Sequence, residues 1–172
     1  MKRFVIAVLM IFCLGSVAGA ADLKIGFVDL QKALSLSAAG QAAKAKMDNE
    51  LQSVQAEVLK RQGDLTALQE SLKKQLALLS VEAKQEKERE FQQQVKDYQR
   101  FTKDQKEAMR SKEMMFTKQI LRDLSAQVMI LSKDKGVAMM FEKGQLVYAV
   151  DSIDFTDELI NAYDAEYNDS HK

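Results

Sequence analysis

The stretch MDNELQSVQAEVLKRQGDLTALQESLKKQLALL, residues 47–79, decides the fold, because its apolar side chains recur in steps of four and three. This spacing places them along one side of an α-helix and is typical of a coiled coil. One seam position, Arg61, carries a charge instead. The apolar stripe consists of Met47, Leu51, Val54, Val58, Leu65, Leu68, Leu72, Leu76 and Leu79. We therefore expect a long helix that packs against a second helix.

A second apolar stripe follows and weakens in its middle, where Thr102, Gln105 and Lys112 occupy seam positions. Its members are Phe91, Val95, Tyr98, Met109, Phe116, Ile120, Leu124, Val128 and Leu131. A charged segment, residues 79–90, separates the stripes and predicts the tip of a helical hairpin. Helices of about 40 and 50 residues would be roughly 60 and 75 Å long. Residues 38–135 are thus expected to form one antiparallel coiled-coil arm.

Short elements flank this arm. Before it, KIGFVDL, residues 24–30, predicts a β-strand, and LQKALSL, residues 30–36, predicts two helical turns. Ser37 is a suitable N-cap for the first long helix, and Gly136 a suitable end for the second. The flanking residues, 21–37 and 136–172, would together form a small body at one end of the arm.

After the arm, VAMMFEKGQLVYAV, residues 137–150, predicts an antiparallel β-hairpin. Its turn would span residues 142–145, with Gly144 at positive φ. The expected cross-strand pairs are Phe141–Leu146, Met139–Tyr148 and Val137–Val150. Both faces of this hairpin are apolar, so both are expected to be covered.

A last helix, residues 155–167, is expected to begin at a cap formed by Asp154 or Thr156. It would present Leu159, Ile160 and Tyr163 to the sheet. Three short strands and one helix cannot cover two apolar faces, so we expect the body to self-associate. The expected fold class is α+β, a long helical-hairpin arm on a small β body.

The first 20 residues have the three parts of a secretory signal peptide. Lys2 and Arg3 form a basic start, an apolar run covers residues 4–14, and Ala18-Gly19-Ala20 is typical of a cleavage site. Cleavage after about Ala20 would leave an exported protein, and an uncleaved anchor is the alternative. Cys13 is the only cysteine, so the mature chain would have no disulfide to stabilise its small core.

Charge is unevenly distributed along the chain. Residues 38–135 hold 19 basic and 15 acidic side chains, a net charge of +4. The remainder of the expected mature chain holds 4 basic and 10 acidic side chains, a net charge of −6, which gives −2 for residues 21–172. This balance argues against nucleic-acid binding, which needs a strongly basic face.

The residues that most catalytic sites need are missing. His171 is the only histidine, and no glycine-rich phosphate loop follows a strand. The aspartates at 151, 154 and 157 lack the spacing and the glycine of an EF-hand loop. We therefore expect a protein that is not an enzyme and that carries no cofactor and no metal.

The order of these segments resembles the Skp (OmpH-like) family of periplasmic chaperones. The specific parts of the resemblance are the strand at residues 24–29 and the close of the chain, where residues 144–149 precede Asp154-Phe155-Thr156-Asp157-Glu158. The resemblance covers nearly the whole mature chain, although the arms match only in kind. It implies a homotrimer in which strands from three subunits form a small β-barrel and three arms surround a cavity.

The resemblance also implies an ATP-independent holdase that binds unfolded outer-membrane β-barrel precursors in the periplasm and prevents their aggregation. The best-known members are strongly basic, whereas the net charge here is −2, which argues against direct contact with lipopolysaccharide or anionic lipid. Two alternatives remain open. One is a coiled-coil scaffold of the cell envelope without clients, and the other is a membrane-surface binder that uses basic arms.

A diffuse cavity leaves no compact motif, so candidate residues are chosen by chemistry. The candidates for client contact are Met114, Met115, Phe116, Lys73, Lys74, Lys84, Lys87 and Arg89. Flexible thioether and aromatic groups adapt to varied clients, and basic groups attract acidic segments at long range. The candidates for the oligomerisation body are Ile25, Phe27, Val28, Val137, Met139, Phe141, Leu146, Tyr148 and Val150.

Overall fold

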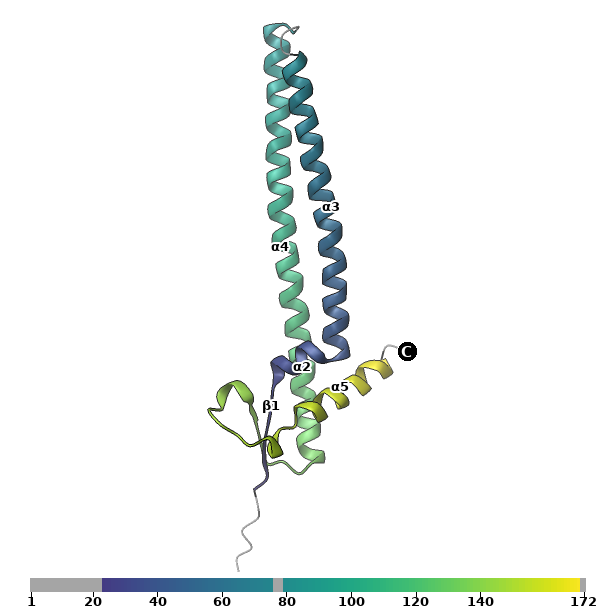
Figure 1. Cartoon of the computed structure of the whole chain (residues 1–172), viewed down its shortest axis with the longest axis vertical. Coiled ribbons are helices and arrows are strands. Elements are labelled where there is room, and N and C mark those ends of the chain that lie inside the picture. Colours follow the sequence, from purple (N-terminus) through teal and green to yellow (C-terminus); the bar gives the residue numbers. More distant parts are fainter. Residues whose placement is uncertain (1–22, 76–78, 171–172) are drawn as a thin grey trace, which may run out of the picture.

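The computed structural model describes residues 23–75 and 79–170 (Figure 1). The elements in chain order are β1 (Ile25–Val28), α2 (Leu30–Leu36), α3 (Ala38–Gln75), α4 (Val81–Asp134), β2 (Met139–Glu142), η1 (Lys143–Gln145), η2 (Asp151–Ile153) and α5 (Thr156–Ser170). The expected signal peptide lies outside the described residues, as does the seam residue Leu76. None of the helices in the described ranges is long and apolar enough to cross a membrane.

Helices α3 and α4 run antiparallel and side by side, and they form an arm that projects from a small body (Figure 1). Most seam residues are only half-buried, because two helices alone cannot enclose a core. Two of the polar seam positions, Arg61 and Lys112, make contacts across the arm. The guanidinium of Arg61 lies 4.0 Å from the ring centre of Phe101, and Lys112 forms an ion pair with Glu50 across the arm.

Helix α4 is capped at both ends by its own sequence. Ser80 Oγ accepts a hydrogen bond of 3.3 Å from the amide of Ala83, so the charged segment after Ser80 is already helical. At the other end, Gly136 has a φ of +63°, and the amide of Val137 donates to the carbonyl of Ser132 at 2.8 Å. This is a Schellman ending, and it turns the chain from the arm into the body.

The predicted antiparallel hairpin at residues 137–150 is wrong. Strand β2 pairs instead with β1 in parallel, in the register Ile25↔Met139 to Val28↔Glu142. Gly144 does not adopt positive φ, and residues 143–145 form a single 3-10 turn closed by the amide of Leu146 and the carbonyl of Lys143. Without a reversing turn, residues 146–150 leave the sheet. The parallel pair is possible because the whole arm connects its two strands.

The core of the body lies between α5, the lower part of α4, α2 and β1. Leu124 of α4 and Leu159 of α5 are fully buried, and Tyr163 is 5% exposed. Helix α5 therefore packs mainly on helices and not, as expected, on a sheet. Phe155 packs over β1 at Gly26, where a Cβ atom would lie 2.6 Å from the ring.

Polar contacts fix α5 to the start of the chain. Asp154 accepts a hydrogen bond of 2.8 Å from the amide of Thr156, which makes it the predicted cap. The buried Thr156 Oγ1 accepts a bond of 2.8 Å from the amide of Asp29. Asp29 in turn caps α2 by accepting a bond of 2.8 Å from the amide of Lys32, and this bond is the main cause that lowers the pKa of Asp29 below 3.8.

Candidate functional site

The residues predicted to contact clients fall into two separate groups. The basic residues lie at the tip of the arm, in the last turn of α3 and the first turns of α4, whereas Met114, Met115 and Phe116 lie near its root. Arg89 and Met114 are 25 positions apart in one helix, which corresponds to about 37 Å at 1.5 Å per residue. The structure thus does not bring the two groups together.

The tip group is a solvated charged surface. Lys87 forms an ion pair of 2.7 Å with Glu90, and Arg89 lies 3.8 Å from Glu86. The bond to Glu90 also raises the pKa of Lys87. Exposed pairs of this kind contribute little to stability. Lys73, Lys74 and Lys84 are the other basic members, and Lys84 is half-buried.

Of the root group, only Phe116 lines the two hollows of the arm, and Met114 and Met115 lie outside both linings. Met114 and Met115 are 57% and 58% exposed, while Phe116 is half-buried between α3 and α4. Phe116, Ala43 and Ile120 each line two different grooves. Small side chains on α3, among them Ala39 and Ala42, leave this room beside the large side chains of α4.

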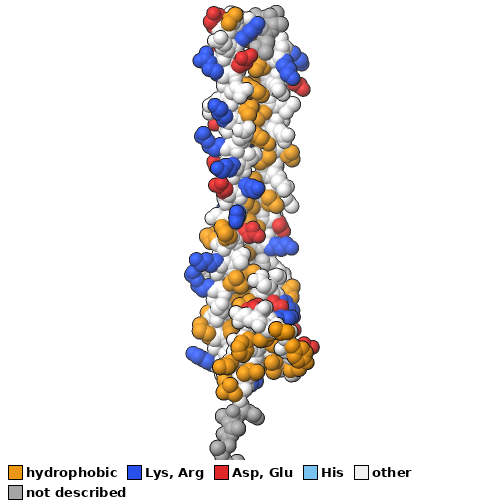
Figure 2. All heavy atoms as spheres, turned by 90° about the vertical axis from the view of Figure 1, so that its left-hand side faces the viewer, with side chains coloured by type: hydrophobic (Ala, Val, Ile, Leu, Met, Phe, Trp, Pro, Cys, Tyr) orange, Lys and Arg blue, Asp and Glu red, His pale blue; other side chains and the backbone are white. Residues whose placement is uncertain are grey.

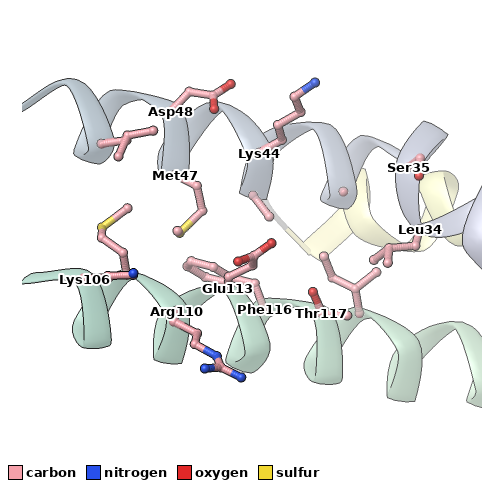
Figure 3. A pocket seen from close by; sticks show the side chains of 15 residues that line it. Leu34, Ser35, Lys44, Met47, Asp48, Lys106, Arg110, Glu113, Phe116 and Thr117 are labelled. Atoms are coloured by element: carbon pink, nitrogen blue, oxygen red, sulfur yellow. The ribbon is translucent and has the colours of Figure 1, made fainter. Parts of the chain in front are cut away.

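The first hollow, which we name the Met47 groove, has a volume of about 620 Å³ (Figure 3). Met47 from α3 and Phe116 from α4 face each other in it, and Leu34 of α2 lies at one end (Figure 3). Its apolar lining is Leu34, Ala43, Met47, Leu51, Met109, Phe116 and Ile120. Its charged lining is Lys44, Lys106, Arg110, Asp48 and Glu113, which sums to +1.

The second hollow, which we name the Tyr163 groove, has a volume of about 520 Å³ and lies between α3, α4 and the outer half of α5. Its apolar and aromatic lining is Ala39, Ala42, Ala43, Phe116, Ile120, Ala126, Ile130, Tyr163 and Tyr167. Its polar lining is Lys46, Gln119, Asp123, Gln127, Glu166 and Ser170.

Two features of the Tyr163 groove concern its polar groups. Burial raises the pKa of Tyr163 to about 12, with Asp123 adding to the effect, so the phenol is neutral in the physiological range. Gln127 is 8% exposed, and its Oε1 has no hydrogen-bond partner among the described residues. Neither residue is predicted for a site from the sequence, because Tyr163 has the position of a core residue and Gln127 lies beside a seam position.

The residues predicted for the oligomerisation body divide by exposure. Phe27, Val28 and Val137 are buried inside their own chain, whereas Met139 is 53% exposed and Tyr148 is 83% exposed. Val147, which was not a candidate, is fully exposed. Hydrophobic side chains gather over this part of the body (Figure 2). The remaining candidates are partly or largely exposed: Ile25, Phe141, Leu146 and Val150.

No group of three or more potential metal-ligating side chains occurs in the part of the chain that the structure describes. The grooves thus offer apolar contact, hydrogen bonding and charge at their edges. This chemistry suits the binding of a partner.

Comparison with known proteins agrees with this architecture. No curated protein sequence matches the chain significantly. Among six solved chains that match, one is the crystal structure of a protein from Caulobacter crescentus CB15 described as an OmpH-like outer membrane chaperone, with a TM-score of 0.80 and 17% identity. The alignment covers 88% of this chain and 89% of that one, which shows the fold. The sequence model "Outer membrane protein (OmpH-like)" matches residues 24–163. The chain therefore belongs to the OmpH-like outer membrane protein family.

Proposed function

We propose that this protein is an ATP-independent holdase chaperone, which binds unfolded outer-membrane β-barrel precursors in the periplasm and keeps them from aggregating. The observation that carries the proposal is the pair of open apolar grooves on either side of Phe116, in a chain that belongs to the OmpH-like family. Shallow apolar surface with flexible methionines at its edge suits partners that have no fixed shape.

The test is dilution of a urea-unfolded outer-membrane β-barrel protein into buffer with and without this protein, followed by light scattering. We expect suppression at equimolar amounts. Phe116→Ala removes the wall shared by both grooves and should weaken the suppression. Phe91→Ala, a half-buried seam residue near the tip, is the matched control and should retain it. Undiminished scattering with the wild-type protein would contradict the proposal and favour a structural scaffold.

We further propose that the working form is a homotrimer assembled through the β body. Within the described residues, the sheet has only two strands, and two strands alone are marginal in water. Residues 146–150 make no strand in their own chain, yet Val147 and Tyr148 are almost completely exposed. Pairing of these residues with neighbouring copies would cover the apolar surface and complete a barrel.

Sedimentation at micromolar concentration tests the assembly. The wild-type chain should sediment with a trimer's mass, and Tyr148→Glu should lower that mass. Leu59→Glu is the control, because Leu59 is 68% exposed on the arm, away from the body, and its replacement should leave the mass unchanged. A monomeric wild-type mass would refute trimeric assembly and leave the proposal for client binding untouched.

A further inference from the structure

We propose that the Tyr163 groove is a binding site for a short apolar segment of unfolded polypeptide flanked by basic residues. The inference rests on the holdase function proposed above and assigns one place on the chain where a client is held. Three observations carry it: one unpartnered buried acceptor inside the groove, the apolar lining of the groove and the sign of its charge.

The first observation is a buried polar atom of the groove that lacks a partner among the described residues. Gln127 is more than nine-tenths buried, and its Oε1 accepts no hydrogen bond from the described residues. A buried acceptor left in this state costs about 1–3 kcal/mol. The hydroxyl of Tyr163, which lines the groove from the facing helix α5, can donate a hydrogen bond. A peptide group fits both side chains, because its N–H can donate to Gln127 and its C=O can accept from Tyr163.

The second observation is the size and lining of the groove. Its volume of about 520 Å³ lies within the range of ligand sites, roughly 300–1,000 Å³. Alanines on α3 form one wall, and Phe116, Ile120 and Ile130 of α4 form another. Such a lining favours an aliphatic or aromatic side chain, and helix α5 extends away from the arm (Figure 1).

The third observation is charge. Asp123 and Glu166 line the groove against a single cation, Lys46, whose Nζ lies 5.5 Å from the ring centre of Phe116. Ser170, the last residue of α5, also lines it, so the negative end of that helix adds to the potential. The Met47 groove has the opposite net sign. The Tyr163 groove should therefore favour lysine-flanked segments and disfavour glutamate-flanked ones.

The test uses fluorescence anisotropy of labelled leucine-rich peptides, flanked by lysine or by glutamate, with the full chain. We expect the lysine-flanked peptide to bind at least tenfold more tightly, with a difference that shrinks as salt is raised. Ala42→Phe fills the groove and should weaken binding of this peptide about tenfold. Ala45→Phe, also exposed on α3 but outside both grooves, should leave binding unchanged.

Charge reversal provides a test that does not depend on packing. Glu166 is exposed, so Glu166→Lys should fold and should invert the preference between the two peptides. Gln127→Leu removes the unpartnered acceptor and should weaken binding severalfold without lowering the urea midpoint. Circular dichroism verifies folding of each variant.

Two outcomes overturn the inference. One is equal binding by wild type and Ala42→Phe. The other is no peptide binding at all, as would occur if a second copy of the chain fills the groove. Neither outcome contradicts the holdase proposal if the wild-type protein still suppresses aggregation. Peptide binding without suppression of aggregation would contradict the holdase proposal but not the assignment of the Tyr163 groove as a peptide site.

Discussion

The carboxylate of Asp164 in α5 accepts a hydrogen bond of 2.7 Å from the backbone amide of Ala38, the first residue of α3. The two residues are 126 positions apart, so this bond ties the C-terminal helix to the start of the arm. Helix α3 thus receives part of its N-terminal capping from a distant helix, in addition to the bond of 3.3 Å from the amide of Gly40 to Ser37 Oγ.

Asp164→Ala should destabilise the body, because it removes an acceptor for one of the free amides at the start of α3. Loss of an N-cap acceptor costs about 1 kcal/mol. Asp104→Ala, an exposed site within α4, makes the same change in helix propensity without removing a cap and is the control. The measurement is urea unfolding followed by circular dichroism. Equal midpoints for the two variants would show that the bond does not contribute.

Two glycine replacements should have opposite effects. Gly26→Ala places a Cβ atom 2.6 Å from the ring of Phe155, which must move out of the core, so we expect a loss of about 1–3 kcal/mol. Gly63→Ala in the middle of α3 meets no atom within 4 Å and should stabilise the arm by about 1 kcal/mol. Thermal unfolding of both variants measures the difference. A change of the same sign in both would contradict the packing at Phe155.

Arg61→Ala should loosen the middle of the arm, because the guanidinium stacks on Phe101 at the seam position that the apolar stripe omits. A cation–π contact at a half-exposed site is worth about 0.5–1 kcal/mol. Arg100→Ala, exposed on the same part of α4, is the control. Hydrogen exchange should become faster around residues 57–65 and 97–105 in Arg61→Ala only. Equal hydrogen-exchange rates around these residues in the two variants would contradict a stabilising contact between Arg61 and Phe101.

Asp29 should make stability depend on pH at the acid end. Its folded-state pKa lies below 3.8, mainly because its carboxylate accepts the hydrogen bond from the Lys32 amide. The unfolded chain therefore takes up the proton first, so the stabilisation is complete above pH 3.8 and is lost as pH falls below it. Asp29→Asn keeps a capping oxygen but cannot titrate. Urea midpoints between pH 5 and pH 2.5 should fall less steeply in this variant, and parallel curves would exclude the contribution.

The arm could be predicted from the sequence because its signals are local. Heptad spacing, the cap at Ser80 and the ending at Gly136 act within a few residues, so helix period and helix ends follow from neighbouring side chains. The same holds for Ser37, Asp154 and the short helix α2.

The site depended on contacts that a single stripe cannot reveal. Phe101 is not part of the predicted apolar stripe, yet the guanidinium of Arg61 stacks on its ring. Lys112 interrupts the stripe, and Glu50 on the facing helix forms an ion pair with it. The Tyr163 groove arises only when α5 lies beside α3 and α4 and brings Tyr163 and Gln127 into one lining. No periodicity in the sequence specifies that helix-to-helix arrangement.

The sequence by itself determined a long antiparallel arm with a small apolar body at its base, because side-chain period and capping are properties of contiguous residues. Only the tertiary structure decided how the body is paired. Two apolar runs separated by a glycine predict a hairpin, but β2 pairs with β1 instead. The two long helices of the arm connect these strands and bring the chain back beside β1. Strand pairing depends on which backbone edge is near in space, and here that edge belongs to residues more than a hundred positions away.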